Sequence, residues 1–382
     1  MTKQTKTKIT QISKYYHPFA GGLEVVAKQI SEVMQSKGFE LEVIALSENL
    51  KDSIESINGI PVRRCGRLFE FKSNPISLSF IRELSRVDTD ILHYHHPYIF
   101  AAIVHFIARP KYKHLTVSYH GDITRQKHIM KFFNPVYEAF LNRADRIHVL
   151  SEFIKDLSTT LNAIKYKKNQ IHVIPYGIPI NSFQNINDEN INKIKDIFNN
   201  KTIILYVGRF YPAKGVEYLI RAMNYVNDNA VLVLIGSGFL KKSLETIVSQ
   251  NKLETKVFFT GDKIDQELID YYQACHMLAL PSISETFGIV QLEAMACAKP
   301  VINTNLNTAS NKVSVHNETG LTVEPHSPEA LAMAINTLIS DDQLREKLGN
   351  NAKKRVEQFF SIDLIGEQYC QFFDFQETRG VK

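Results

Sequence analysis

Short apolar runs alternate along the chain with longer stretches whose apolar positions recur at helical spacing. The first series of runs has the length and β-rich character of buried strands: KITQIS, LEVIAL, ILHYH, LTVSYH, RIHVLS and IHVIPYG. A second series follows it: TIILYVGRF, AVLVLIGSG, KVFFTG, MLALPS, KPVINT and TGLTVE. Strands that alternate with helices are typical of parallel sheets with crossover helices. The pattern therefore predicts an α/β protein with two Rossmann-like domains, which we expect to face each other across a cleft.

A polar, Asn-rich stretch at residues 181–200 separates the two series. The turn Pro175–Gly177 ends the first series, and proline with glycine marks a sharp change of chain direction. We therefore predict domains at residues 1–180 and 181–382. The pattern becomes wholly helical in SPEALAMAINTLISDD and beyond, where serine before proline is typical of a helix start. We assign these closing helices to the second domain.

Composition narrows the function classes. The 382 residues are 44% hydrophobic and 22% charged, as in soluble globular proteins, which excludes disorder as the main state. The formal charge of +5 is too small for so long a chain to indicate a nucleic-acid partner. The four cysteines lie far apart, so neither a disulfide framework nor a zinc knuckle is indicated. With no signal-peptide pattern and no apolar run of membrane-spanning length, we expect a cytoplasmic protein, and any membrane contact that it makes should be peripheral.

The strongest candidate site is the segment SISETFGIVQLEAMACAKPVI. We expect Glu285 in a loop after a strand and Glu293 inside a helix that opens near Gly288. Such a loop presents a carboxylate beside the free backbone N–H groups of a helix N-terminus, which is suited to a diphosphate. Glu293 is about one and a half turns into the helix and can reach back to a polar ligand.

Two cations precede this motif in the same predicted domain. Arg209 and Lys214 flank a turn after a strand, where they could neutralise a pyrophosphate leaving group. The glycines Gly236 and Gly238 permit close backbone approach. They make a weak dinucleotide signal, because Lys241 occupies the position of the third glycine of that fingerprint.

The first predicted domain offers two further candidates. Gly21 and Gly22 lie between its first strand and first helix, where bare backbone admits a sugar or phosphate or simply makes a tight turn. His120 ends the run LTVSYH, and a histidine at the carboxyl end of a strand faces the expected cleft, which favours contact with a ligand.

Two metal-like patterns are expected to be structural. Asp88 and Asp90 form an Asp-x-Asp, but they precede the strand ILHYHH and so lie at the wrong end of the sheet for a ligand. His93 and His95 share a strand face from which His96 points away, and no third ligand at matching spacing follows. His95 or His96 could instead line the cleft. We expect no bound metal.

Together these features resemble the family four glycosyltransferases, a retaining, nucleotide-sugar-dependent class with the GT-B fold. The Glu-x7-Glu motif with FG inside and EAMAC after it is the specific part of the resemblance. Nearly the whole chain takes part, in the family's order: the Gly21–Gly22 loop, His120, Arg209 with Lys214, the Glu285–Glu293 motif and the closing helices.

The resemblance implies a role for individual residues in the donor site. It implies that Glu285 holds the donor sugar together with the backbone around Phe287, Gly288 and Ile289, with Gly21 and Gly22 close by. It also implies that Glu293 holds the ribose and that Arg209 and Lys214 hold the diphosphate. His120 is implied to lie at the transferred sugar. The residues implied in catalysis are His120, Arg209, Lys214 and Glu285. No cofactor is implied, because the nucleoside diphosphate sugar is a substrate, and no metal, because the two cations replace it.

Within the family, the stretches KYYHPFAGGLE, HGDITRQK and VINTNLNTASNKVSVHNETG look most like bacterial O-antigen and capsule enzymes, often mannosyl- or rhamnosyl-transferases. Ala298, Asn307 and Ala309 stand where such relatives often carry glycine, and a side chain there narrows the pocket. The implied reaction moves a hexosyl unit from a GDP- or UDP-linked donor to a lipid-linked or oligosaccharide acceptor in surface polysaccharide biosynthesis.

Other functions fit the residues less well. An NAD-dependent dehydrogenase needs the glycine fingerprint that the chain lacks, and a phosphorylase-like enzyme needs a pyridoxal lysine for which no motif exists. A GT-B epimerase-like enzyme and an inactive sugar-binding module remain as alternatives. The segment TRQKHIMKFFNPVYEAFLNR sets cations beside bulky apolar groups, so it either contacts an anionic inner membrane or packs into the core: Arg125, Lys127, Ile129, Met130, Lys131, Phe132 and Phe133.

Overall fold

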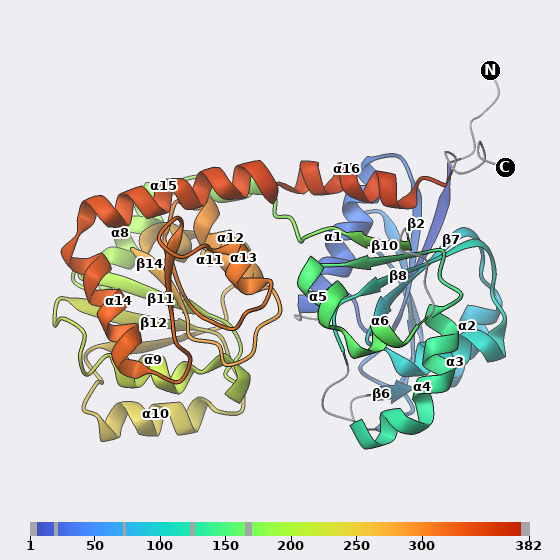
Figure 1. Cartoon of the computed structure of the whole chain (residues 1–382), viewed down its shortest axis with the longest axis horizontal. Helices are drawn as coiled ribbons and strands as arrows, with labels where there is room; N and C mark the ends of the chain where they lie inside the picture. Colours follow the sequence, from blue (N-terminus) through green and yellow to red (C-terminus); the bar gives the residue numbers. More distant parts are fainter. Residues whose placement is uncertain (1–5, 19–21, 72–73, 123–126, 165–169, 376–382) are drawn as a thin grey trace. The chain divides into compact units, whose positions relative to one another are not determined.

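The computed structural model describes residues 6–18, 22–71, 74–122, 127–164 and 170–375. The chain divides into two compact units, and Figure 1 shows in each a sheet flanked by helices. The first unit comprises Met1–Tyr176 and Asp363–Lys382, and the second comprises Gly177–Ile362. The division falls inside the Pro175–Gly177 turn, four residues before the predicted boundary.

The first unit contains an eight-stranded sheet in the order β10-β9-β8-β7-β1-β2-β4-β3. Every neighbouring pair is parallel except β3 with β4. The strands are β1 (Lys8–Ile12), β2 (Glu40–Leu46), β3 (Ser53–Ile57), β4 (Ile60–Cys65), β7 (Asp88–His96), β8 (Lys111–Tyr119), β9 (Arg146–Val149) and β10 (Ile171–Val173). A separate antiparallel pair is formed by β5 (Phe69–Phe71) and β6 (Asn74–Ile76).

The helices of the first unit connect these strands and cover the sheet. They are α1 (Gly22–Ser36), α2 (Leu78–Ser85), α3 (Ile99–Ala108), α4 (Lys127–Leu141), α5 (Glu152–Leu157), α6 (Thr159–Ala163) and, from the end of the chain, α16 (Ile362–Phe373). The sequence predicted six strands of this sheet: β1, β2, β7, β8, β9 and β10. It did not predict β3 to β6 and α2, which lie within residues 53–85.

The second unit contains a wholly parallel six-stranded sheet in the order β13-β12-β11-β14-β15-β16. The strands are β11 (Thr202–Val207), β12 (Ala230–Ile235), β13 (Val257–Gly261), β14 (Met277–Leu280), β15 (Val301–Thr304) and β16 (Gly320–Val323). All six were predicted. Every residue of β12 is buried, as expected for a central strand covered on both faces.

Helices pack on the second sheet in two groups (Figure 1). One group is α9 (Val216–Ala222), α10 (Lys241–Gln250) and α14 (Pro328–Ser340). The other includes α7 (Ile180–Gln184), α8 (Asp188–Ile197), α11 (Asp265–Ala274), α12 (Ile289–Ala296) and α15 (Asp342–Phe359). The expected start of α14 is confirmed, because the Ser327 side chain accepts a hydrogen bond from the Ala330 N–H and Pro328 is the first helical residue.

The last helix belongs to the first unit, so our assignment of every closing helix to the second domain was wrong for α16. Its apolar face, with Ile365, Tyr369, Phe372 and Phe373, is buried. The Phe373 ring lies 5.2 Å from that of His93 on β7, and Arg146 donates to the backbone oxygens of Gln371 and Phe372. The amphipathic spacing of a sequence predicts that a helix buries one face, but it does not predict on which of two sheets the helix packs.

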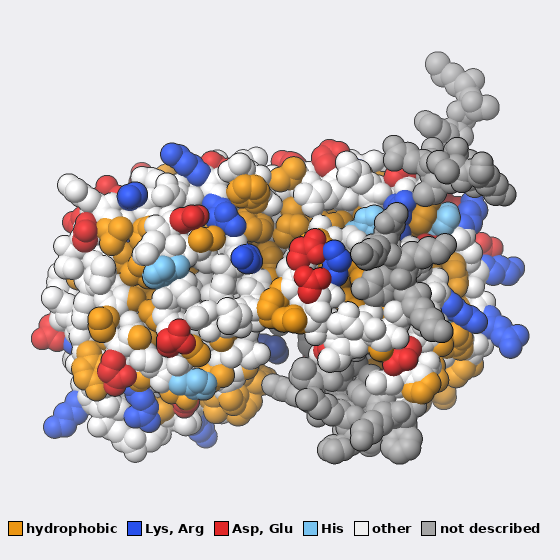
Figure 2. All heavy atoms as spheres, viewed as in Figure 1, with side chains coloured by type: hydrophobic (Ala, Val, Ile, Leu, Met, Phe, Trp, Pro, Cys, Tyr) orange, Lys and Arg blue, Asp and Glu red, His pale blue; other side chains and the backbone are white. Residues whose placement is uncertain are grey.

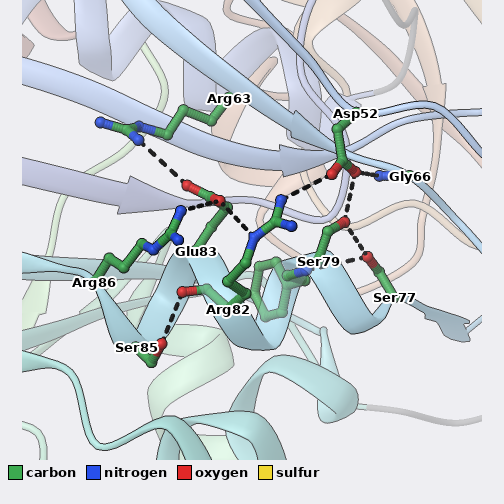
Figure 3. Close-up of polar contacts among 10 residues, drawn as sticks. Asp52, Arg63, Gly66, Ser77, Ser79, Arg82, Glu83, Ser85 and Arg86 are labelled. Atoms are coloured by element: carbon green, nitrogen blue, oxygen red, sulfur yellow. Dashed lines mark hydrogen bonds and ion pairs between the residues drawn. The ribbon is translucent and has the colours of Figure 1, made fainter.

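Polar contacts hold α2 against the loops that follow β2 and β4 (Figure 3). The Asp52 carboxylate accepts hydrogen bonds from the Gly66 N–H, the Ser79 hydroxyl and Arg82 at 2.6–2.9 Å. Hydrogen bonding from Ser79, then from Gly66, lowers the pKa of Asp52 despite partial desolvation. Glu83 of α2 forms ion pairs with three arginines: Arg63, Arg82 and Arg86. These groups are tied to one another and fix a segment that hydrophobic periodicity did not reveal.

The surface and the cysteines agree with the composition. On the face shown in Figure 2, Lys and Arg side chains are scattered among acidic and apolar ones. All four cysteines are free, as expected. Within the described ranges, no helix combines the length and the apolar character that a membrane span requires.

Candidate functional site

The segment with Glu285 and Glu293 forms the connection between β14 and α12. Helix α12 begins at Ile289, and Gly288 is its N-cap with φ 77°, a left-handed conformation that favours glycine. No side chain caps this helix end. The first-turn N–H groups therefore lack a side-chain acceptor from the cap residue, as expected for a helix end that binds an anion. The predicted helix start is confirmed.

The structure brings Glu285 and Lys214 together. The Lys214 Nζ lies 2.5 Å from the Glu285 Oε2, and the two side chains are 27% and 13% exposed. The Ser282 hydroxyl also donates to this carboxylate, at 3.4 Å. A cation and a carboxylate that are 71 residues apart in sequence thus form a half-buried pair beside the start of α12.

Backbone contacts fix the two loops that carry this pair. Lys214 ends the 3-10 turn η2 (Pro212–Lys214), whose Ala213 carbonyl accepts from the N–H groups of Ile283 and Ser284 at 2.8 and 3.0 Å. A Cβ atom on Gly215 would lie 2.1 Å from the Pro281 carbonyl oxygen, so only glycine allows this approach. The pair is therefore held by its backbone as well as by its charges.

Arg209, the second predicted cation, lies on the connection after β11. Its guanidinium lies over the Tyr211 ring, 4.9 Å from the centroid, and its side chain is exposed. The Arg209 carbonyl accepts from the Tyr206 hydroxyl at 3.1 Å. Stacking on an aromatic face orients the planar guanidinium while leaving its N–H edge open for a phosphate.

The remaining residues of the motif contact protein groups. The Glu293 carboxylate accepts from the Tyr272 hydroxyl at 2.5 Å; burial raises its pKa and that hydrogen bond lowers it in part. The Phe287 ring is buried and packs in a T-shaped contact with the Phe360 ring, with the two ring centroids 6.1 Å apart. The Phe287 side chain thus serves packing and leaves only its backbone for a ligand.

The Gly-x-Gly segment holds two loops together. Cβ atoms added to Gly236 and Gly238 would lie 2.0 Å from the Gly208 oxygen and 2.5 Å from the Phe210 oxygen. Both glycines have positive φ angles. Their lack of side chains is therefore required by neighbouring backbone.

In the first unit, His120 follows the carboxyl end of β8, as predicted. It is 7% exposed, and both ring nitrogens have partners: the Tyr176 hydroxyl at 2.7 Å and the His95 Nδ1 at 3.2 Å. Burial first, then the neighbouring histidines, moves the pKa of His120 far below its ordinary value. His120 is therefore a neutral imidazole.

His120 belongs to a wider network of buried histidines. His93 contacts the Thr116 and Ser118 hydroxyls at 2.8 and 3.0 Å, and Ser118 also contacts His148 at 2.8 Å. His96 lies on the opposite strand face and stacks on the Tyr119 and Tyr137 rings. Among the residues that the structure describes, no three histidine, cysteine or acidic side chains gather so as to hold a metal ion.

We expect this network to make the protein sensitive to acid. Burial holds the pKa of His148 at about 4 and that of His96 at about 3, whereas unfolded histidine titrates near 6.5. The unfolded state thus takes up protons first, so the free energy of unfolding should fall as pH drops from about 6.5 toward 4, by up to about 1.4 kcal/mol per pH unit for each such histidine.

Urea unfolding at several pH values measures this slope. His148→Gln should make it shallower, and the matched change His17→Gln, at an exposed histidine, should leave it unchanged. A stability that is constant between pH 7 and pH 5 in the unmodified protein would contradict the expectation.

The Asp-x-Asp pattern, which we expected to be structural, contacts protein groups through Asp90. Asp90, near the amino end of β7, pairs with Lys113 at 2.6 Å and accepts from the Lys8 N–H at 2.9 Å.

Among the other predicted residues of the first unit, Gly22 begins α1, whereas Gly21 lies outside the described residues. Arg125 also lies outside them, as do the side chains of residues 127–132.

Comparison with known proteins assigns the two halves of the chain. Residues 20–182 match the sequence profile described as Glycosyltransferase Family 4, and residues 187–355 match that described as Glycosyl transferases group 1. The chain belongs to the family 4 glycosyltransferases.

Two relatives of this glycosyltransferase align over almost the whole chain. The O-antigen chain mannosyltransferase C of Escherichia coli is 29% identical over 96% of this chain and 98% of its own length. The D-rhamnosyltransferase WbpZ of Pseudomonas aeruginosa is 28% identical over 91% and 90%. The predicted family and its glycosyltransferase activity are confirmed.

A solved structure confirms the GT-B fold of this glycosyltransferase. Anabaena Alr3699/HepE, solved in complex with UDP and glucose, superposes with a TM-score of 0.78 over 96% of this chain and 99% of that one. The two sequences are 22% identical, so the likeness concerns the fold.

Two buried polar residues that hold the motif of this glycosyltransferase in place, Ser282 and Gln291, were not predicted from its sequence. Ser282 is fully buried, donates to Glu285 and accepts from the Thr304 hydroxyl. Gln291 is fully buried on α12. A glutamine among the apolar residues of IVQLEAMA was a visible signal of a buried polar contact.

Proposed function

We propose that the chain is a retaining, metal-independent glycosyltransferase that moves a hexosyl unit from a nucleoside diphosphate sugar to a hydroxyl group. The acceptor in this proposal is lipid-linked or an oligosaccharide, and the process is surface polysaccharide biosynthesis. The relatives named for O-antigen mannosyl and rhamnosyl transfer support this substrate class. They also favour a transferase over an epimerase-like enzyme or an inactive module.

The observation that carries the proposal is the Lys214–Glu285 pair beside the uncapped start of α12. In the proposed complex the donor diphosphate lies at the first-turn N–H groups of α12, and Lys214 and Arg209 neutralise its charge. A lysine ammonium has three N–H donors, so Lys214 can donate to a phosphate while it stays bound to Glu285. Glu285 then accepts a hydrogen bond from a hydroxyl group of the donor sugar.

The proposed chemistry is same-face displacement at the anomeric carbon of the donor. The bond from that carbon to the leaving phosphate oxygen breaks, and a bond to the acceptor oxygen forms on the same face. The acceptor proton passes to the leaving phosphate. Lys214 and Arg209 stabilise the charge that develops there. We propose that His120, a neutral imidazole, contacts the transferred sugar, and that Glu293 contacts the ribose.

Donor hydrolysis tests this proposal without knowledge of the acceptor, because water replaces it. GDP- and UDP-linked hexoses are first screened by thermal shift, since a ligand that binds only the folded state raises the melting temperature. The stabilising donor is then hydrolysed in excess EDTA, with the first anomer released read by proton NMR. We expect retained configuration and undiminished rate. A product of inverted configuration would refute the retaining mechanism. Activity that is lost in EDTA and restored only by added manganese or magnesium would refute metal independence.

We further propose that the protein works as a peripheral protein at the inner face of the cytoplasmic membrane. The segment that suggested this includes α4, where Phe133 and Val136 are partly exposed. The protein should co-sediment with phosphatidylglycerol vesicles at low salt and detach as salt rises. Lys127→Glu with Lys131→Glu should abolish this binding, whereas Lys241→Glu with Lys242→Glu on α10 should not. Salt-insensitive binding, or none, would remove the membrane proposal.

A further inference from the structure

A buried polar cluster lies directly behind the Glu285 loop. Gln291 on α12, Asn303 on β15 and Ser310 at the start of α13 (Ser310–Val313) are at most 1% exposed. Buried polar side chains are costly unless they are hydrogen-bonded, so each needs its partners.

Gln291 uses both ends of its amide. Its Nε2 donates to the Phe287 carbonyl at 3.0 Å and to the backbone and side-chain oxygens of Ser310 at 3.2 and 3.0 Å. Its Oε1 accepts from the Asn303 Nδ2 at 3.0 Å. One side chain thus ties the Glu285 loop to the connection that follows β15.

Asn303 extends the cluster away from the loop. Its Nδ2 also donates to the Ser314 carbonyl at 3.3 Å, and its Oδ1 accepts from the Thr322 hydroxyl at 2.8 Å. The amide of Gln291 is therefore held from behind by a second buried amide, which is itself fully hydrogen-bonded.

The contact with Phe287 decides the direction of a backbone N–H group. A trans peptide is planar, and its C=O and N–H point in opposite directions. Because the Phe287 carbonyl points to Gln291, the N–H of Gly288 in the same peptide points away from the buried cluster. Gly288 also makes room for the amide, since a Cβ there would lie 2.9 Å from the Gln291 Nε2.

We propose that Gln291 is a positioning residue for sugar transfer: it locks the Phe287–Gly288 peptide so that its N–H faces the donor. Because glycine has no side chain to restrict its backbone angles, the Phe287–Gly288 peptide could adopt other orientations at Gly288. The hydrogen bond from the Gln291 amide to the Phe287 carbonyl restrains it to one of them. The inference rests on the proposed function, which assigns the backbone from Phe287 to Ile289 to the donor sugar. Gln291 itself touches no substrate.

Gln291→Met tests the inference, because methionine keeps the length of the side chain and removes its hydrogen bonds. We expect the KM for the donor, or its Kd by thermal shift, to rise about tenfold, the effect of one well-placed hydrogen bond. The matched control is Thr322→Val, which removes a hydrogen bond at the far end of the same cluster. It should lower the melting temperature and leave the donor KM unchanged.

Gln291→Glu is the second variant, in case the methionine variant fails to fold. It keeps the oxygen that accepts from Asn303 and, when ionised, loses the donors to Phe287 and Ser310, so the donor KM should rise in the same way. If a Gln291 variant lowers the melting temperature while its donor KM stays normal, Gln291 is structural only and the inference is wrong. The same holds if Thr322→Val raises the donor KM equally.

Glu285→Ala, measured in parallel, separates this inference from the proposed function. If Glu285→Ala leaves donor turnover unchanged, the assignment of the loop to the donor fails. If Glu285→Ala abolishes turnover while both Gln291 variants keep a normal donor KM, only the positioning role fails.

Discussion

Replacing Lys214 with alanine is expected to lower the turnover of donor by about a hundredfold or more, the effect of losing one preorganised charge at a developing oxyanion. Lys214 is held by Glu285 and by the backbone of η2, so it needs little rearrangement to meet a phosphate. Arg209→Ala should act in the same direction. Donor hydrolysis rates and melting temperatures of both variants measure the effect, with only a small change expected in the melting temperature.

Lys241→Ala is the matched control for the lysine. Lys241 is an exposed residue of α10 that pairs with Glu245 at 3.9 Å, and surface pairs of this kind contribute little to stability. The turnover of donor by the Lys241→Ala variant should equal that of the unmodified protein. Near-normal turnover in both Lys214→Ala and Arg209→Ala would exclude the role that we propose for the two cations.

Replacing Glu285 with glutamine is expected to reduce turnover on a similar scale, about a hundredfold, but to act on the sugar and not on the diphosphate. Glutamine has the same size and still accepts from Ser282, yet it carries no charge to pair with Lys214. The freed ammonium should keep or improve the binding of UDP or GDP alone. Lys214→Ala should weaken that binding, so nucleotide affinity distinguishes the two variants.

Glu267→Gln serves as the control for this second substitution, because it removes a different carboxylate–lysine pair, the one between Glu267 on α11 and Lys263. It should change neither turnover nor nucleotide affinity. A Glu285→Gln variant with ordinary turnover, or one that loses nucleotide binding as fully as Lys214→Ala does, would show that the carboxylate does not contact the donor sugar.

Most of the regular structure was predictable because local pattern and packing agree. The strands of the parallel sheets are short apolar runs bounded by turn residues, and the helix starts at Ser327 and Gly288 carry local signals. The segment at residues 53–85, which contains β3 to β6 and α2, was not predicted, because contacts between polar groups distant in sequence hold much of it in place. Asp52, for example, joins Gly66 and Arg82, and no periodicity records such contacts.

The candidate site was predictable in its members but not in their contacts. Residue type and spacing identified Glu285, Lys214 and the N-terminus of α12, since each has a chemistry that its sequence context displays. The contacts themselves depend on how segments distant in sequence pack together. They are the Lys214–Glu285 ion pair, the hydrogen bond from Tyr272 to Glu293, and the contacts of His120 with Tyr176 and His95. The buried Gln291 was overlooked, because its partners Asn303 and Ser310 lie 12 and 19 residues away.

The sequence by itself determined the α/β class, the two series of strands and the residue types that can bind a diphosphate, because these follow from periodicity and side-chain chemistry. Tertiary structure alone decided which unit receives α16, which carboxylate neutralises Lys214, and which amide orients the Phe287–Gly288 peptide. The physical reason is common to all three. A buried partner is chosen by the geometry of segments far apart in the chain, whereas a local pattern records only that some partner is needed.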